Sequence, residues 1–369
     1  MERKGLTRSK KSAIVQYLFE HKNASKTELT KALSFSMPTV LQGTNELVEQ
    51  GILIEVGEYE STGGRRAKSL ALNHNAVHAV GLDITTNRIS FVLVNFVGEI
   101  VQYKEIRKPF ANTMDYYREL ADELTLFLHE VNLKEDQILG VGVSLPGILN
   151  SDEKILIKSN ILKLDGISLK MLEHFVLCPV HYVNNANAAL MMEWNSAQND
   201  AIYLLLGDAV GGAFRISGKV LLGINRMSGE FDHMIIVPDG RPCYCGKNGC
   251  AYTYCSGQAL ERTAGMTIEE LMVKVDQNDP VVMQIWDEYL NYVAIMIANL
   301  RTMFDGDIII GGDVGAHLEK HMFTLGKKVM KYNTVDSDIS YLKTSSYKKG
   351  GAAAGAALYY ILQYIDNIV

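Results

Sequence analysis

The sequence has no run of about eighteen consecutive apolar residues, the length that a membrane-spanning helix requires. Its opening segment, MERKGLTRSKKS, leads into an amphipathic pattern and not into the apolar core of a secretion signal. The five cysteines are an odd number, so they cannot all pair in disulfides. These absences predict a cytoplasmic protein with reduced thiols and no membrane segment.

Charge is distributed unevenly along the 369 residues, whose net charge is −6. Residues 1–75 hold eleven Lys and Arg against eight Asp and Glu, whereas the remainder holds 25 against 34. A small basic module can approach a polyanion such as DNA, and an acidic body cannot. The imbalance is small enough that accidental scatter is the alternative explanation.

The first half of the basic module reads as two helices. Apolar residues recur on one helical face between Ser12 and His21. Ser25 and Glu28 form a capping box, which predicts a second helix that runs through Leu33. The predicted order of elements is therefore a helix, a short turn and a second helix.

A third helix follows, with Ser36 as its cap and Pro38 in its first turn, and it ends at Gly51. We expect the start of this helix to be exposed and to enter the major groove of double-stranded DNA, where hydroxyls and amides read base edges. The candidate base-reading residues are Ser36, Met37, Thr39, Gln42 and Thr44.

A β-hairpin is predicted after the third helix, with strands at residues 52–54 and 67–72. Its tip carries Arg65 and Arg66 after two glycines, where two guanidinium groups can reach phosphates or a narrow minor groove. Three helices and a hairpin make a winged helix-turn-helix. The alternative is a three-helix protein-interaction module with a solvated arginine pair.

From residue 79 onward, strand and helix patterns alternate, which indicates an α/β body. A strand, a turn and a second strand are expected over residues 79–101, and further strands at 138–145, 180–183, 201–206 and 213–216. A strand with a glycine turn is expected at 308–315, and helices near 114–131, 287–304 and 350–368. Asn184 and Asn185 directly follow one of these strands. Polar groups at the carboxyl end of a strand are where α/β folds bind ligands.

One imidazole and three thiols lie close together in the sequence, at His233, Cys243, Cys245 and Cys250. Glycines between the cysteines allow the backbone to fold back tightly. This set predicts a closed tetrahedral zinc site, and four protein ligands leave no position for a catalytic water, so the zinc is structural. A group of reduced thiols without metal is the alternative.

The motifs together resemble those of the ROK family, which contains sugar kinases and sugar-responsive repressors. The resemblance rests on GEFDHMIIV from Gly229, CYCGKNGCAY from Cys243, NNANAA from Asn184, the glycine pair at 311–312, and GGRRAKSLALN from Gly63. It implies a two-lobed actin-like ATPase fold behind the winged helix. The implied domains are residues 1–75 for DNA binding and 76–369 for the ROK body, with lobe 1 at about 76–180 plus 350–369 and lobe 2 at about 181–349.

Three departures from the family pattern separate this sequence from the kinases. Asn185 stands where the kinases have the aspartate that acts as general base, and an amide cannot take a proton. Ile84 stands in the first phosphate loop, where we expect its branched side chain to obstruct the phosphate. Tyr252 replaces a glutamate that accepts sugar hydroxyls, which affects the choice of ligand.

Positions that match the family's sugar contacts form a plausible sugar site, since vicinal hydroxyls need several fixed acceptors and amides. They are Gly147, Asn160, Asn184, Asn185, Glu230, His233 and Tyr252. The resemblance therefore implies a non-enzymatic repressor of carbohydrate genes, a homodimer or tetramer, that a sugar releases from its operator. A sugar kinase with an appended domain and a protein-docking module without a small ligand are the alternatives.

Overall fold

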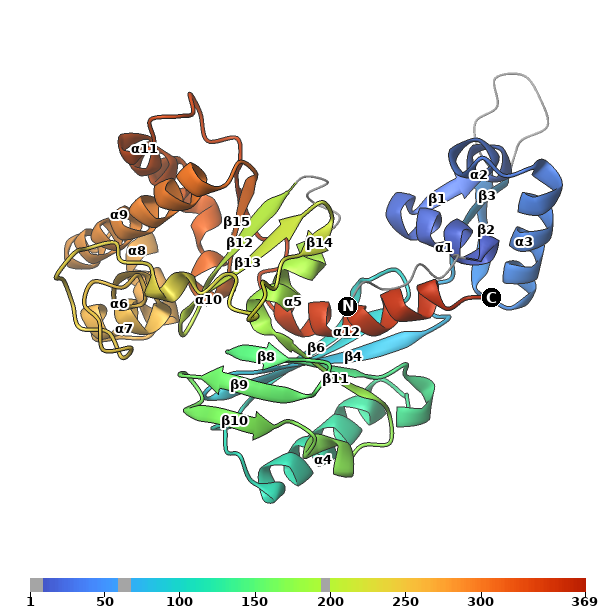
Figure 1. Ribbon diagram of the computed structural model, residues 1–369, viewed down its shortest axis with the longest axis horizontal. Helices are drawn as coiled ribbons and strands as arrows, with labels where there is room; N and C mark the ends of the chain where they lie inside the picture. The colour runs from blue at the N-terminus through green and yellow to red at the C-terminus, as the bar shows by residue number, and fades with distance from the viewer. Residues whose placement is uncertain (1–8, 59–67, 194–199) are drawn as a thin grey trace.

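The structure is a computed structural model that describes residues 9–58, 68–193 and 200–369. A winged-helix module and two α/β lobes make up these residues (Figure 1). Within them, no helix is both long enough and apolar enough to cross a membrane.

The N-terminal module has the winged-helix order that the sequence predicts, with one additional short strand. Its elements are α1 (Lys10–His21), β1 (Asn23–Ser25), α2 (Lys26–Leu33), α3 (Met37–Glu49), β2 (Leu53–Glu58) and β3 (Lys68–Leu72), and the strand order is β1-β3-β2. The capping box of Ser25 and Glu28 is formed, and the Ser36 hydroxyl caps α3. Both helix starts are therefore confirmed.

Lobe 1 is built on a five-stranded mixed sheet in the order β11-β7-β4-β5-β6, which α4 covers on one face. The elements are β4 (His78–Ile84), β5 (Arg88–Asn95), β6 (Ile100–Arg107), α4 (Met114–Glu130), β7 (Val141–Leu145) and β11 (Val180–Asn184). Because β11 pairs with β7 in parallel, it belongs to the first sheet. The expected lobe boundary near residue 181 is therefore wrong, and it lies after Asn184.

A small antiparallel sheet extends lobe 1 beside the ends of its main strands. Its strands are β8 (Ile148–Asn150), β9 (Ile155–Ser159) and β10 (Leu164–Ser168). Gly147 begins this extension with φ +132°, and a Cβ there would lie 2.5 Å from the carbonyl oxygen of Lys158. Only glycine fits this turn.

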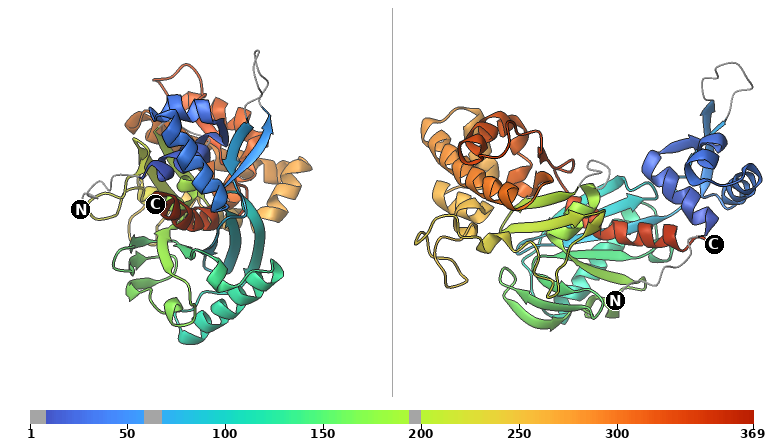
Figure 2. Two further views of the ribbon diagram at one scale, coloured as in Figure 1. Left: turned by 90° about the vertical axis from the view of Figure 1, so that its right-hand side faces the viewer. Right: turned by 45° about the horizontal axis from the view of Figure 1, so that its top comes forward.

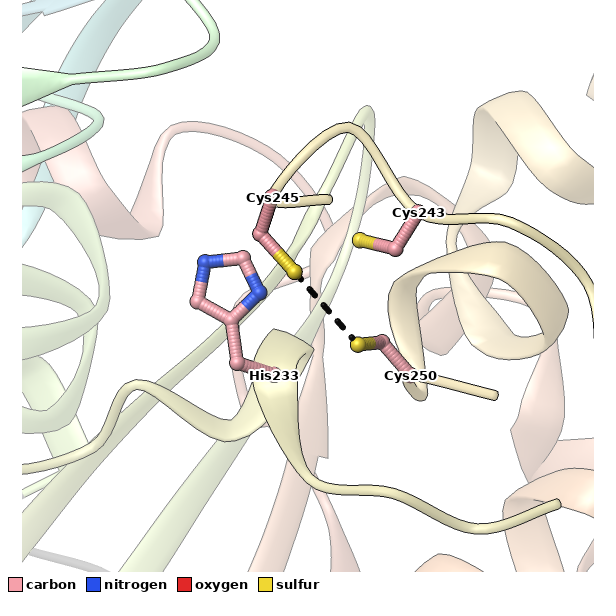
Figure 3. A group of neighbouring side chains, drawn as sticks. All are labelled: His233, Cys243, Cys245 and Cys250. Atoms are coloured by element: carbon pink, nitrogen blue, oxygen red, sulfur yellow. Dashed lines mark hydrogen bonds between the residues drawn. The ribbon is translucent and has the colours of Figure 1, made fainter. Parts of the chain in front are cut away.

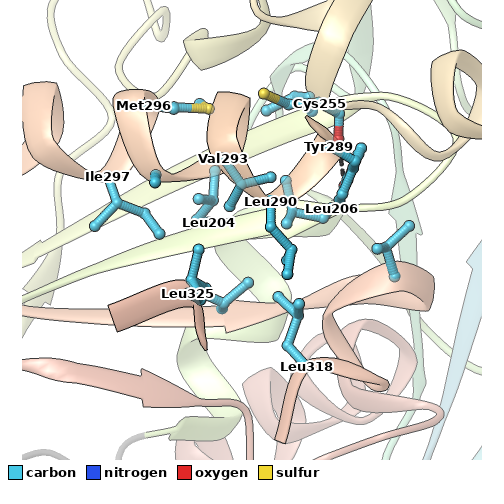
Figure 4. Close-up of a cluster of buried hydrophobic side chains, with 14 of the residues drawn as sticks. Leu204, Leu206, Cys255, Tyr289, Leu290, Val293, Met296, Ile297, Leu318 and Leu325 are labelled. Carbon is cyan, nitrogen blue, oxygen red and sulfur yellow. Dashed lines mark hydrogen bonds between the residues drawn. The ribbon is translucent and has the colours of Figure 1, made fainter. Parts of the chain in front are cut away.

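Lobe 2 is a second five-stranded sheet, in the order β14-β13-β12-β15-β16, with a helical layer at one side. Its strands are β12 (Ala201–Leu206), β13 (Val210–Ile216), β14 (Lys219–Val220), β15 (Asp307–Gly311) and β16 (Leu342–Thr344), and its helices are α6 (Tyr252–Cys255), α7 (Gly257–Ala264), α8 (Ile268–Asp276), α9 (Pro280–Met303), α10 (Gly312–Gly315) and α11 (Met322–Tyr332). Leu290, Val293 and Ile297 of α9 pack onto Leu204 and Leu206 of the sheet (Figure 4).

Two helices of small residues, α5 (Asn185–Met192) and α12 (Gly351–Asp366), lie between the sheets of the two lobes. Their backbones pass unusually close to their neighbours. A Cβ on Gly81 of β4 would lie 1.8 Å from the Ala353 carbonyl oxygen, and a Cβ on Gly355 would lie 1.7 Å from that of Ala188. Small side chains at these positions let α12 pack directly against both lobe 1 and α5.

The far end of α12 packs against the winged-helix module (Figure 2). Leu18 and Phe19 of α1 belong to the same buried cluster as Leu358 and Ile365 of α12. The hydroxyl of Ser9 also donates to the carbonyl oxygen of Ile368 at 2.5 Å. The winged-helix module and lobe 1 thus share one hydrophobic core.

Candidate ligand cavity, metal cluster and nucleic-acid face

The start of α3 is exposed, as the sequence analysis expects. Ser36, Met37 and Gln42 are exposed and Thr39 is half-buried. Thr44 differs, because its side chain is fully buried and its hydroxyl donates to the Val40 carbonyl oxygen at 2.7 Å. The prediction that Thr44 reads base edges is therefore wrong. Arg65 and Arg66 lie outside the described residues.

The predicted metal ligands come together in one cluster (Figure 3). The ligand atoms of His233, Cys243, Cys245 and Cys250 all lie within 4.8 Å of one another. The sulfurs of Cys245 and Cys250 are 3.7 Å apart. Among the described residues, the Nδ1 atom of His233 is buried and has no hydrogen-bond partner. A metal ion would supply that partner, and the cluster can hold one.

Local backbone geometry explains how four ligands meet. Cys243 donates its backbone N–H to Lys247 at 2.8 Å, and Gly246 donates to Cys243 at 3.0 Å, which closes a tight loop around the second thiol. Gly249 has φ +82°, and a Cβ there would lie 1.8 Å from the Val237 carbonyl oxygen. Gly249 is therefore required by both backbone angle and space, and Gly246, with φ +83°, by backbone angle alone.

A cavity of about 860 Å³ is lined by residues of both lobes. Five of the seven predicted sugar contacts line it, namely Gly147, Asn160, Asn184, Asn185 and Glu230. Desolvation raises the pKa of Glu230 to about 7, and the neighbouring Asp232 carboxylate adds to the shift. The side chain of Glu230 remains accessible from the cavity.

His233 and Tyr252 are the two predicted sugar contacts that do not line the cavity. The ring of Tyr244 packs edge-on against both, with centroids 5.3 Å from His233 and 4.6 Å from Tyr252. Tyr244 itself lines the cavity, and Tyr252 donates instead to Gln258 at 2.9 Å. The structure therefore does not support sugar contact by either residue, because Tyr244 stands on the cavity side of both.

Asp232 and Tyr244 are cavity residues that the sequence analysis did not identify. The Tyr244 hydroxyl donates to the Asp232 carboxylate, and Asn160 is a second hydrogen-bond partner of that hydroxyl. Asp232 occupies a position where the family motif has glycine, and this departure was the signal that could have revealed it. The sequence around Tyr244 gives no comparable indication, because its neighbours Cys243 and Cys245 point only to metal binding.

The two asparagines at the start of α5 have structural roles as well as access to the cavity. Asn184 accepts from the backbone of Asn187 at 3.0 Å, which caps α5, and donates to the Gly147 carbonyl at 3.0 Å. The Asn185 side-chain oxygen accepts from the backbone N–H of Ala186 at 2.9 Å. Asn184 therefore caps a helix and also lies in the cavity wall.

One part of the cavity wall holds the Arg88 guanidinium among four carboxylates, one of which is Glu105 of the neighbouring strand at 3.8 Å. Arg88 of β5 pairs with Asp313 of α10, and Asp83 and Asp208 lie close enough to act on the same charges. Desolvation raises the pKa of Asp83 to about 6, although the Ser144 hydroxyl that it accepts opposes the shift. In this part of the cavity the Arg88 guanidinium therefore attracts the carboxylates, and the carboxylates repel one another.

The side chain of Ile84 is 1% exposed and lies in the lobe 1 core, not in the cavity. The expectation that it obstructs a phosphate is therefore wrong, because β4 continues through Ile84, which pairs with Ile89. Arg88 and the four carboxylates around it line the cavity here instead.

Comparison with known proteins gives one family match. The ROK family matches residues 79–362. The xylose repressor of Bacillus subtilis strain 168 is 26% identical over 309 residues, covering 80% of this chain and 80% of the relative. A glucokinase from Halalkalibacterium halodurans is 28% identical over 266 residues, covering 64% of this chain and 80% of the relative.

Among solved structures, a ROK family transcriptional regulator described as a homologue of the Escherichia coli MLC protein is similar in fold. The TM-score is 0.75 at 20% identity, and the alignment covers 97% of this chain and 96% of that one. Such coverage includes the winged-helix module together with both lobes.

Proposed function

This chain belongs to the ROK family, and from that membership we propose that it is a sugar-responsive transcriptional repressor without kinase activity. The winged helix binds operator DNA, the cavity binds a sugar, and the sugar releases the operator. Relatives named as xylose repressors support this function, and they match a larger share of the chain than the glucokinase does. We assign DNA binding to residues 1–75 and ligand binding to the rest.

One observation carries the proposal, namely the path along α12. Residues Gly350, Gly351 and Ala352, at and just before its first turn, line the cavity. Ile365, in its last turn, packs in the core that α1 of the winged helix completes. A single helix thus touches the ligand cavity at one end and the DNA-binding module at the other. A change in how the lobes close can reach α1 by rigid-body movement of α12.

Phosphoryl transfer is disfavoured by the chemistry of the cavity. Asn185 cannot act as a general base, and its side chain is engaged by the backbone of Ala186. Asp208 and Asp313 present carboxylates beside Arg88, where they would repel a nucleotide phosphate. Transfer needs a base at the Asn185 position and a held phosphate, and the described residues at these two places provide neither.

We infer that the metal is zinc and that its role is structural. Tetrahedral zinc with Zn–S bonds of about 2.3 Å separates two thiolates by roughly 3.8 Å, and the Cys245 and Cys250 sulfurs are 3.7 Å apart. His233 would bind through Nδ1, the nitrogen that lies toward the sulfurs and has no other described partner. Bound zinc would fix the loop that carries Glu230 and Asp232.

We also propose that the repressor acts as a homodimer, or as a tetramer built from two such dimers, because two winged helices can then grip the half-sites of a pseudo-palindrome. In each winged helix the residues that would read bases are Ser36, Met37, Thr39 and Gln42, with Arg65 and Arg66 on phosphates.

The test is a fluorescence-anisotropy titration of DNA from carbohydrate operons, at fixed salt, with and without a panel of sugars. The proposal predicts tight binding to one operator and its loss with one class of sugar. ATP-dependent sugar phosphorylation by the purified protein would overturn it.

A further inference from the structure

Two carboxylates stand together at the end of the cavity that borders the metal cluster. Oxygen atoms of Glu230 and Asp232 lie within 4.8 Å of each other and of a nitrogen of His233. Asp232 is 7% exposed, whereas Glu230 opens to the cavity. Both residues line the cavity, so a ligand at this end meets both carboxylates.

Tyr244 fixes the position of Asp232. Its hydroxyl donates to the Asp232 carboxylate, across twelve positions of sequence. Tyr244 lies between the ligands Cys243 and Cys245, and Asp232 directly precedes the ligand His233, so the metal cluster holds both ends of this hydrogen bond. The side chain of Asp232 is therefore preorganised against the cavity and is not a mobile surface acid.

Positive charge is scarce around this pair. Among the described residues, the Glu230 carboxylate makes no ion pair, and only the backbone carbonyl of Glu230 accepts a hydrogen bond, from the N–H of His233. Arg226, the nearest guanidinium on the same loop, pairs with Asp152 of lobe 1 at 3.0 Å. The residues that line the whole cavity include ten Asp and Glu against six Lys and Arg. A ligand that carries a phosphate or carboxylate would meet uncompensated negative charge.

We propose that Asp232, held by Tyr244, is the residue that determines ligand choice, and that with Glu230 it selects unphosphorylated sugars whose protonated amino group faces the carboxylate pair. The inference rests on the proposed sugar response and names the ligand class within it. An ammonium group donates three charge-assisted hydrogen bonds to carboxylates, whereas a hydroxyl donates one neutral hydrogen. Asn160, Asn184 and Asn185 remain for the hydroxyls of the same sugar.

Isothermal titration calorimetry on the full-length, zinc-loaded protein tests this directly. The probes are glucosamine, galactosamine and mannosamine, each beside its parent hexose and the 6-phosphate of that hexose. Either group would donate to a carboxylate, but only the ammonium adds a charge–charge attraction, which we expect to give a preference of about tenfold for the best amino sugar over its parent. Binding of the 6-phosphates should be weaker than that of either.

Two variants separate ligand choice from a structural role. Asp232→Asn keeps the size of the side chain and an acceptor for Tyr244, so zinc content and melting temperature should stay unchanged while the amino-sugar preference falls to about twofold or less. Glu269→Gln removes a cavity carboxylate far along the sequence from the pair and should leave the preference intact. A purely structural role for Asp232 would lower the affinity for all probes equally.

The outcomes separate this inference from the function on which it rests. If the parent hexoses bind as tightly as the amino sugars, or the 6-phosphates bind best, the inference is overturned while the sugar response stands. If operator DNA binds but none of these probes binds, the inference is overturned, and the wider sugar panel of the operator titration then decides whether the sugar response fails as well. A preference that survives Asp232→Asn also overturns the inference.

Discussion

Arg88 and Asp313 form an ion pair across the cleft between the two lobes. The guanidinium belongs to the first residue of β5 in lobe 1, and the carboxylate to α10 in lobe 2. Asp208 adds a second lobe 2 carboxylate that acts on the same guanidinium. The pair therefore joins the two lobes directly, in a part of the cavity wall that is rich in charged side chains.

Loss of the ion pair between Arg88 and Asp313 should allow the two lobes to move apart. In Arg88→Ala, four carboxylates would remain without the cation between them, which we expect to lower the free energy of unfolding by roughly 1–2 kcal/mol. Small-angle X-ray scattering should also show a larger radius of gyration. Lys348→Ala is the control, because Lys348 pairs with Glu319 where both side chains are about two-thirds exposed. Unchanged scattering and stability in Arg88→Ala would show that the ion pair does not hold the two lobes together.

Metal content provides a second test. Cys245→Ser leaves three ligands, so the purified variant should lose most of its zinc and melt several degrees lower, since structural zinc contributes folding free energy. Cys178→Ser is the matched control, because Cys178 is a free thiol outside the cluster. Elemental analysis should give about one zinc per chain in the wild type and the control. Wild-type protein without zinc, prepared without chelator, would contradict the assignment.

Gln42 and Thr44 make a matched pair on α3. Gln42 is exposed, so Gln42→Ala should relax preference at one base step at a cost of about 1–3 kcal/mol. Thr44 is buried, so Thr44→Val should lower stability slightly and leave base preference unchanged. Selection from randomised operators, followed by sequencing, measures both. Equal weakening on every sequence by Gln42→Ala would show that α3 is not placed in the major groove as proposed.

Asp83 predicts a specific dependence of stability on pH. Desolvation raises its pKa from 3.8 to about 6 in the folded protein. A carboxyl group whose pKa is raised in the folded state makes its full contribution to stability below the pKa that it has in the unfolded state. This contribution is lost as the pH rises through about 6. Asp83→Asn keeps an acceptor for Ser144 without the charge. Its free energy of unfolding should therefore exceed that of the wild type by roughly 1–3 kcal/mol at pH 7.5 and equal it near pH 4.

Urea unfolding at both pH values measures the effect. Asp165→Asn, on the exposed strand β10, is the control and should shift stability equally at both. A gain for Asp83→Asn that is the same at pH 4 and pH 7.5 would contradict the assignment to a buried charge.

Features set by nearby residues were predictable from the sequence. The capping boxes and the metal cluster depend on spacings of a few positions, and the structure brings those residues together as expected. Thr44 was misjudged, although it lies four residues from Val40 and three from Leu47, both buried, so helical periodicity could have shown its orientation.

Features set by tertiary packing were not predictable. Arg88 and Asp313 are 225 positions apart, and nothing in either local sequence identifies the other. Placement of Tyr244 in front of His233 depends on how the metal loop folds, which spacing alone does not determine. The membership of β11 in the first sheet required knowledge of its parallel partner β7.

The central claim is that a sugar in the cavity weakens operator binding through the body of the protein. Linkage requires reciprocity, so operator DNA must weaken sugar binding by the same factor, typically about 5- to 150-fold. Glu230 lines the cavity and lies far from α3 in the chain, so a change there tests the coupling without touching the DNA-binding face.

The most direct measurement is a titration of labelled operator at fixed salt, for the wild type and Glu230→Ala, with and without the sugar that raises the wild-type melting temperature. We predict that the sugar weakens operator binding by the wild type, and that Glu230→Ala binds operator normally but no longer releases it. Tighter operator binding in the presence of the sugar, or a normal response in Glu230→Ala, would contradict the account.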